Sequence, residues 1–135
     1  MILVDTSVII DKFKKKSNDK TLLFDKIHEI MYPFGISIFT FQEILQGAKT
    51  EQEFKRLESY FSTQRIFYLP DTTESYAKSA RLYFDLRRQG VSVRNTVDVL
   101  IAYTAIANKI PLLHNDRDFD FIAEKIPELE IFKTF

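Results

Sequence analysis

The sequence predicts an α/β fold, an α/β/α sandwich with a central, mostly parallel sheet, built as a single domain from residues 1–135. Short apolar segments alternate along the chain with segments of helical periodicity. The apolar segments lack the clean polar alternation of a half-exposed strand, which indicates strands covered on both faces. The chain contains only three glycines and four prolines and no repeat or linker, so one domain is expected.

The first half of the chain predicts two strands and four helices. In order, they are a strand at 2–4, a helix from Thr6 to about Lys14, a helix over 22–31 that Pro33 ends, a strand at 35–39, a helix over 41–48 and a helix over 54–61. In the helices, apolar residues recur every three or four positions, as one buried face requires.

The second half repeats the alternation. Its elements are a strand at 65–69 that Pro70 ends, a long helix around 76–84 that Gly90 ends, a helix over 97–105, a strand at 111–113, a helix beginning near Phe119 and a final strand at 129–132.

The composition excludes several classes of protein. Without cysteine, the chain has no disulfide framework, thiolate metal site or thiol nucleophile, which fits a cytoplasmic location. The opening residues do not form a signal peptide, and no apolar run approaches the ~20 residues of a membrane span. Because the net charge is zero, binding of a polyanion needs local basic patches or bound cations. The Lys12–Lys16 run and Arg94 are candidate patches, although a charge run is most often a solvated face.

Four acidic residues lie where the predicted strands end or the next helices begin. Asp5 and Asp116 follow strands, whereas Glu43 and Asp98 fall in predicted first turns of helices. Each has a local explanation, since Asp5 fits a helix N-cap, Thr40 with Glu43 fits a capping box, and Asp98 suits the helix dipole. However, the carboxyl ends of parallel strands share one edge of a sheet, where ligands bind. The four carboxylates are therefore expected in one cleft.

Such a cluster of carboxylates favours a hard divalent cation. Crowded carboxylates repel each other and raise an apparent pKa, and Mg²⁺ or Mn²⁺ with its preference for oxygen ligands removes that cost. The two histidines, His28 and His114, do not form a zinc-like ligand set. A metal held by carboxylates can polarise a phosphoryl oxygen and activate water, so a metal-dependent nuclease is the economical inference.

Other acidic sites fit the sequence less well. A calcium loop starting at Asp116 would need Gly and Glu where Phe121 and Pro127 stand. A haloacid-type phosphatase would need a second acid two residues after Asp5, at Ser7. A phospho-receiver domain would leave Glu43 and Asp98 unexplained. Two alternatives stay open: a non-catalytic protein-interaction module whose acids bind a partner's arginines, and another α/β domain that handles phosphoryl groups at an acidic site.

With these residues assembled, the chain resembles the PIN-domain ribonuclease family, and in particular the VapC-type toxins of type II toxin–antitoxin pairs. The resemblance covers essentially the whole chain. It is carried by four stretches in family order and spacing: MILVDTSVII, SIFTFQEILQGA, NTVDVLIAYTAIAN and PLLHNDRDFDFIA.

The resemblance implies a Mg²⁺- or Mn²⁺-dependent endoribonuclease whose metal-binding and catalytic acids are Asp5, Glu43, Asp98 and Asp116. A less uniform family acid maps onto Asp118, and a small hydroxyl residue maps onto Ser7. The resemblance also implies a homodimer, a small cognate antitoxin, and RNA substrates that include tRNA. Many relatives carry Thr two residues before the fourth acid, where this chain has His114.

Several roles remain as alternatives. Glu43 either completes the metal shell or orients the attacking water. Asp118 either serves a weaker second metal position or caps the helix near Phe119. Ser7 is expected to fix a ligand carboxylate or a bound water, unless it is an ordinary first-turn hydroxyl. The candidate RNA contacts are Arg94, Lys14 and Lys15.

Overall fold

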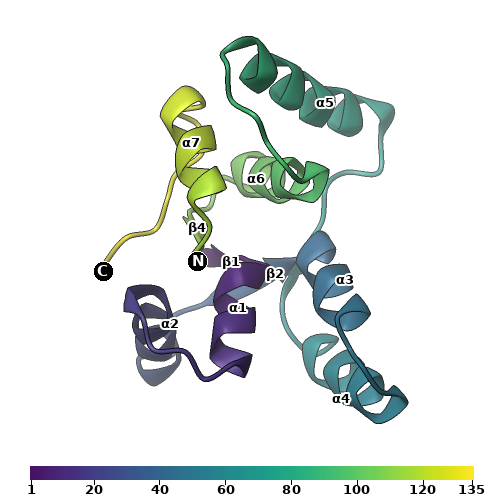
Figure 1. The fold of residues 1–135 in the computed structure, drawn as a ribbon, viewed down its shortest axis with the longest axis vertical. Coiled ribbons are helices and arrows are strands. Elements are labelled where there is room, and N and C mark those ends of the chain that lie inside the picture. Colours follow the sequence, from purple (N-terminus) through teal and green to yellow (C-terminus); the bar gives the residue numbers. More distant parts are fainter.

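A four-stranded, wholly parallel sheet lies at the centre of the computed structural model, which describes residues 1–135 (Figure 1). The strands are β1 (Ile2–Val4), β2 (Phe34–Ser37), β3 (Ile66–Phe67) and β4 (Leu112–Leu113). The helices are α1 (Thr6–Phe13), α2 (Asp19–Glu29), α3 (Ile38–Gln46), α4 (Glu51–Phe61), α5 (Thr73–Arg88), α6 (Thr96–Asn108) and α7 (Arg117–Lys125). None of these helices is long and apolar enough to cross a membrane.

Helices cover both faces of the sheet, and the central strand shows why. Successive side chains of a strand point to opposite faces. Leu3 packs into a core with α5, α6 and α7, whereas Ile2 and Val4 pack into a second core with helices α1 to α4. Figure 1 shows these two groups of helices on opposite sides of the strands. Because β1 is fully buried, it carries an unbroken apolar run, and the predicted α/β/α sandwich is confirmed.

The strand order β3-β2-β1-β4 places the change of winding direction next to β1. From β1 the chain moves outward to β2 and β3, and it then returns to place β4 on the other side of β1. In parallel α/β sheets, such a switch point opens a crevice at the carboxyl ends of the two strands. Asp5 and the loop 114–116 leave the sheet at this point.

The predicted strand at 35–39 ends earlier than expected. Ile38 already belongs to α3, because Ser37 caps that helix by accepting a hydrogen bond from the Thr40 amide at 3.0 Å. The predicted capping box of Thr40 and Glu43 is therefore wrong. Glu43 is the sixth residue of α3 and lies one turn further along the helix than expected.

Two further predicted strands differ from the structure. The pairing at 65–69 is limited to Ile66–Phe67. The predicted final strand at 129–132 is wrong as a strand, since only an isolated parallel bridge joins Ile131 to Leu112. Two backbone hydrogen bonds to Leu112 hold this segment, and β4, with only two residues, offers no longer partner.

Candidate metal centre

Five carboxylates from four separate segments line one pocket at the switch point. They belong to Asp5, Glu43, Asp98, Asp116 and Asp118. Asp5 precedes α1, Glu43 comes from α3, Asp98 from α6, and the last two from the start of α7. The four acids expected to share a cleft are thus brought together, with Asp118 beside them.

Asp5 follows β1 and caps α1, and one of its two carboxylate oxygens has no partner. Its Oδ2 accepts hydrogen bonds from the Ser7 amide at 3.0 Å and the Ser7 hydroxyl at 2.6 Å. Its Oδ1 is buried and accepts none. Burial, and to a lesser degree the charge of Glu43, raises the pKa of Asp5 from 3.8 to about 6 against the effect of the Ser7 hydrogen bonds. A buried, unpartnered carboxylate oxygen is costly unless a cation binds it.

Asp98 lies in the first turn of α6, after the N-cap Asn95, as the sequence predicted. It is 9% exposed. Burial first, and then the charges of Asp5, Asp116, Glu43 and Asp118 in that order, raise the pKa of Asp98 from 3.8 to about 7. Negatively charged side chains therefore act on the Asp98 carboxyl from both ends of the pocket.

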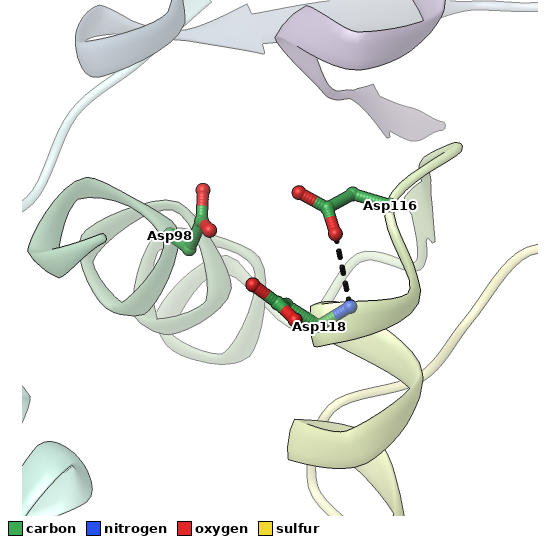
Figure 2. A group of neighbouring side chains, drawn as sticks. All are labelled: Asp98, Asp116 and Asp118. Carbon is green, nitrogen blue, oxygen red and sulfur yellow. Dashed lines mark hydrogen bonds between the residues drawn. The ribbon is translucent and has the colours of Figure 1, made fainter. Parts of the chain in front are cut away.

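Asp116 caps α7, Asp118 lies in the first turn of that helix, and both face Asp98. One oxygen from each of the three carboxylates lies within 4.8 Å of the others, and Figure 2 shows the three side chains converging from two helices. The N-cap of α7 is Asp116, whose Oδ1 accepts the Asp118 amide at 3.0 Å. The alternative in which Asp118 caps a helix near Phe119 is therefore wrong, because α7 begins at Arg117.

Glu43 is held by a hydroxyl that the sequence pattern did not single out. Thr6 donates from Oγ1 to Glu43 Oε1 at 2.7 Å, and its Oγ1 lies 3.2 Å from Thr40 Oγ1. Thr6 and Thr40 are both buried. The only signal in the sequence was the position of Thr6 directly after Asp5, which is also ordinary for the first turn of a helix.

The loop that delivers Asp116 is tied to α1 by side chains far away in the sequence. Ser7 Oγ accepts a hydrogen bond from the backbone amide of Asn115 at 2.9 Å, so this hydroxyl contacts both Asp5 and the loop. The Asn115 side chain donates to Asp11 Oδ2 at 2.6 Å, and this hydrogen bond is the main reason that the pKa of Asp11 is lowered. Asp11 could not be assigned to the site from sequence, because no local pattern connects it to Asn115.

His114 is buried behind the same loop. It is 2% exposed and packs against Phe119 with ring centroids 5.2 Å apart. Its Nδ1 lies 3.1 Å from the Asp116 amide, which can only donate, so Nδ1 is the acceptor. Burial lowers the pKa of His114, which favours the neutral ring with its proton on Nε2. This Nε2 lies 3.3 Å from Asp120 Oδ1 but has no hydrogen bond of good geometry.

The candidate basic residues divide into two groups. Arg94 lines the acidic pocket and is its only basic residue, and its Nε lies 3.3 Å from Asp118 Oδ2. Lys14 and Lys15 are exposed at the end of α1 and do not line the pocket.

The donor set fits a hard divalent cation. Every candidate ligand atom is a carboxylate oxygen, which is the ligand that Mg²⁺ and Mn²⁺ prefer. The unpartnered Oδ1 of Asp5 and the raised pKa values of Asp5 and Asp98 make this pocket a favourable place for a cation. Asp98, Asp116 and Asp118 each offer an oxygen within 4.8 Å of the others, whereas Asp5 and Glu43 line the same pocket outside that compact group.

Sequence comparison shows the family. The PIN domain profile matches residues 2–125. Ribonuclease VapC11 of Mycobacterium tuberculosis is 30% identical over 128 residues, which cover 91% of this chain and 92% of the relative. Ribonuclease VapC1 of Methanocaldococcus jannaschii is 30% identical over 124 residues, which cover 91% of this chain and 82% of the relative.

Solved structures share the fold over nearly the whole chain. VapBC2 from Rickettsia felis, bound to a DNA fragment from its promoter, matches with a TM-score of 0.72 at 22% identity, over 98% of both chains. FitAcB from Neisseria gonorrhoeae matches with a TM-score of 0.72 at 20% identity, over 98% of this chain and 96% of the other.

Proposed function

The chain belongs to the PIN-domain family, and from this membership we propose that it is a metal-dependent endoribonuclease of the VapC type. Residues 1–135 then form a single nuclease domain. The observation that carries the proposal is the convergence of Asp5, Glu43, Asp98 and Asp116 on one pocket, with a buried oxygen of Asp5 left unpartnered. The names of its relatives as ribonucleases support the same class of reaction.

In this proposal, Asp5, Asp98 and Asp116 hold Mg²⁺ or Mn²⁺. When bound, such an ion polarises a phosphoryl oxygen and makes water a nucleophile near neutral pH. The protein contributes orientation. Ser7 fixes the Asp5 carboxylate through two hydrogen bonds, and Thr6 fixes Glu43.

Glu43 is the proposed residue that orients the attacking water or accepts its proton. It is only half-buried and lines the same pocket as Asp5 and Asp98. A carboxylate at hydrogen-bond distance from a water can serve as a general base, which typically contributes about 10²–10⁴-fold to rate.

RNA is the proposed substrate, with structured RNA such as tRNA included. Arg94 at the pocket rim is the proposed contact for a phosphate near the scissile bond, and its guanidinium has five N–H donors to share. Lys14 and Lys15, exposed at the end of α1, are proposed contacts for phosphates further along the strand. Each such contact should make binding weaker as salt rises.

A small antitoxin is the proposed protein partner, and a homodimer is the proposed assembly. Solved structures with this fold include toxin–antitoxin complexes from several bacteria, among them one from Klebsiella pneumoniae. The toxin role follows from the family and from this likeness of fold. In such a pair, a basic side chain of the antitoxin would find an acidic pocket with a deficit of positive charge.

The test is cleavage of single-stranded RNA by the purified protein with Mg²⁺, with Mn²⁺ and with EDTA. Loss of residues that only orient metal ligands costs about 10–100-fold, so Asp98→Asn, which removes a ligand, should slow cleavage by about 100-fold or more. Asp71→Asn is the matched control, because Asp71 is exposed and does not line the pocket.

Circular dichroism should be the same for the parent and both variants. Cleavage at the parent rate by Asp98→Asn would remove the basis of the assignment. No cleavage by the parent protein under any metal condition would instead favour the non-catalytic interaction module.

A further inference from the structure

We infer that Arg94 is the internal counter-ion of Asp118 and restricts the acidic pocket to one divalent cation. This inference rests on the proposed function and concerns the same site. Its starting point is the pair between Arg94 Nε and Asp118 Oδ2, which lie 3.3 Å apart.

The two partners differ in freedom. The Asp118 side chain is 9% exposed and is fixed in the first turn of α7. The Arg94 side chain is 73% exposed and comes from the segment that precedes α6. The carboxylate is therefore fixed in the pocket, and the guanidinium beside it stays positively charged at any working pH, because arginine is not deprotonated in proteins.

The pocket has two ends, and Asp98 lies between them. At one end are Asp5 and Glu43, where no basic side chain lies and Asp5 Oδ1 is unpartnered. At the other end are Asp116 and Asp118, one oxygen of each being within 4.8 Å of an Asp98 oxygen. The only positive charge lining the pocket stands at this second end.

The consequence is a division of the pocket by charge. A cation bound next to Asp5 and Glu43 would lie at the end of the pocket without a basic side chain. A second cation bound against Asp118 would lie close to the guanidinium of Arg94, and the two like charges repel each other. Asp118 thus serves neither as a helix cap nor, while Arg94 is present, as a ligand of a second metal.

The experiment is a Mn²⁺ titration of the full chain without RNA, read by calorimetry and by electron paramagnetic resonance of free Mn²⁺. The parent protein should bind one Mn²⁺ per chain, and Arg94→Gln should bind two. Arg117→Gln is the matched control, because Arg117 is beside the same acids in the sequence but does not line the pocket. It should bind one.

A third variant locates the second ion. Arg94→Gln combined with Asp118→Asn should return to one Mn²⁺ per chain. Two ions on the parent protein, or one on Arg94→Gln, would overturn the inference while leaving the proposed metal site in place. No ion on the parent protein would overturn the proposed metal site itself, and with it the inference. Circular dichroism identifies any variant that fails to fold, and Arg94→Lys, which keeps the charge, should still bind one.

Discussion

Replacing Asp5 with Asn should stabilise the metal-free protein at high pH, although it removes a proposed metal ligand. Burial raises the pKa of Asp5 in the folded protein from 3.8 to about 6. A carboxyl group with a raised pKa favours the folded state fully below pH 3.8 and loses that advantage as the pH rises through about 6. A difference of about 2.2 between the two pKa values, at 1.36 kcal/mol per unit, corresponds to about 3 kcal/mol.

The amide group that Asp5→Asn introduces carries no charge, so it avoids the cost of burying a carboxylate, and it can still cap α1. Its oxygen can accept the two hydrogen bonds from Ser7 that Asp5 Oδ2 accepts, and its uncharged NH₂ replaces the unpartnered oxygen. We expect a gain of about 1–3 kcal/mol in the free energy of unfolding at about pH 8, which falls towards zero near pH 4. Since a domain of this length unfolds with about 0.28 kcal/mol/K of entropy, this gain corresponds to a rise in melting temperature of about 4–11 °C.

The assay is urea and thermal denaturation in EDTA from about pH 4 to about pH 8, repeated with Mn²⁺. Metal at a hundredfold excess over Kd should add about 2.7 kcal/mol to the parent protein and much less to Asp5→Asn. Asp71→Asn, which removes a negative charge outside the pocket, should follow the parent. A metal-free Asp5→Asn protein that is less stable than the parent at high pH, or whose stability difference does not change with pH, would refute the reasoning.

Two further predictions concern positions around the site. His114→Asn should keep the affinity for Mn²⁺, because the new amide oxygen can replace His114 Nδ1 as acceptor for the Asp116 amide, whereas His114→Gln should weaken it by about 10-fold. Calorimetric titration checks this, and equal losses in the two variants would contradict it. Gly35→Ala should destabilise the fold by about 1–3 kcal/mol, as overpacking of a core does. Its new Cβ would lie 2.6 Å from Phe67 Cε2, so an unchanged urea midpoint would show that the sheet adapts freely.

The sequence predicted the parts of the site that depend on local order. Asp5 follows a buried apolar run, and Asp98 follows Asn95 at the spacing of a capped first turn, so both positions could be placed without a structure. The parallel sheet then required that strand ends share one edge. The prediction that the acids meet depended only on this rule of topology, and their common pocket agrees with it.

The sequence-based predictions that failed concern side chains that fit two different local roles, such as a strand residue and a helix cap. Ser37 lies inside the apolar run GISIF and resembles a strand residue, yet its hydroxyl caps α3 and shifts Glu43 deeper into the helix. Asp116 and Asp118 alternate, so either could have capped α7, and only the fold decides for Asp116. The pair of Arg94 with Asp118 and that of Asn115 with Asp11 join positions 24 and 104 residues apart, which no local pattern contains.

The electrostatics of the pocket connect its stability to its activity. The chain has no net charge, but one pocket gathers five carboxylates and a single arginine. Without a cation, this pocket strains the fold, as the raised pKa values of Asp5 and Asp98 indicate, and it also repels a phosphodiester. A divalent ion would relieve both effects at once, so binding of metal should come before binding of RNA. The same deficit of positive charge attracts any cation that fits the pocket, including the guanidinium of Arg94 or a basic side chain of a partner. An organic cation that displaces the metal from this pocket would therefore inhibit the enzyme.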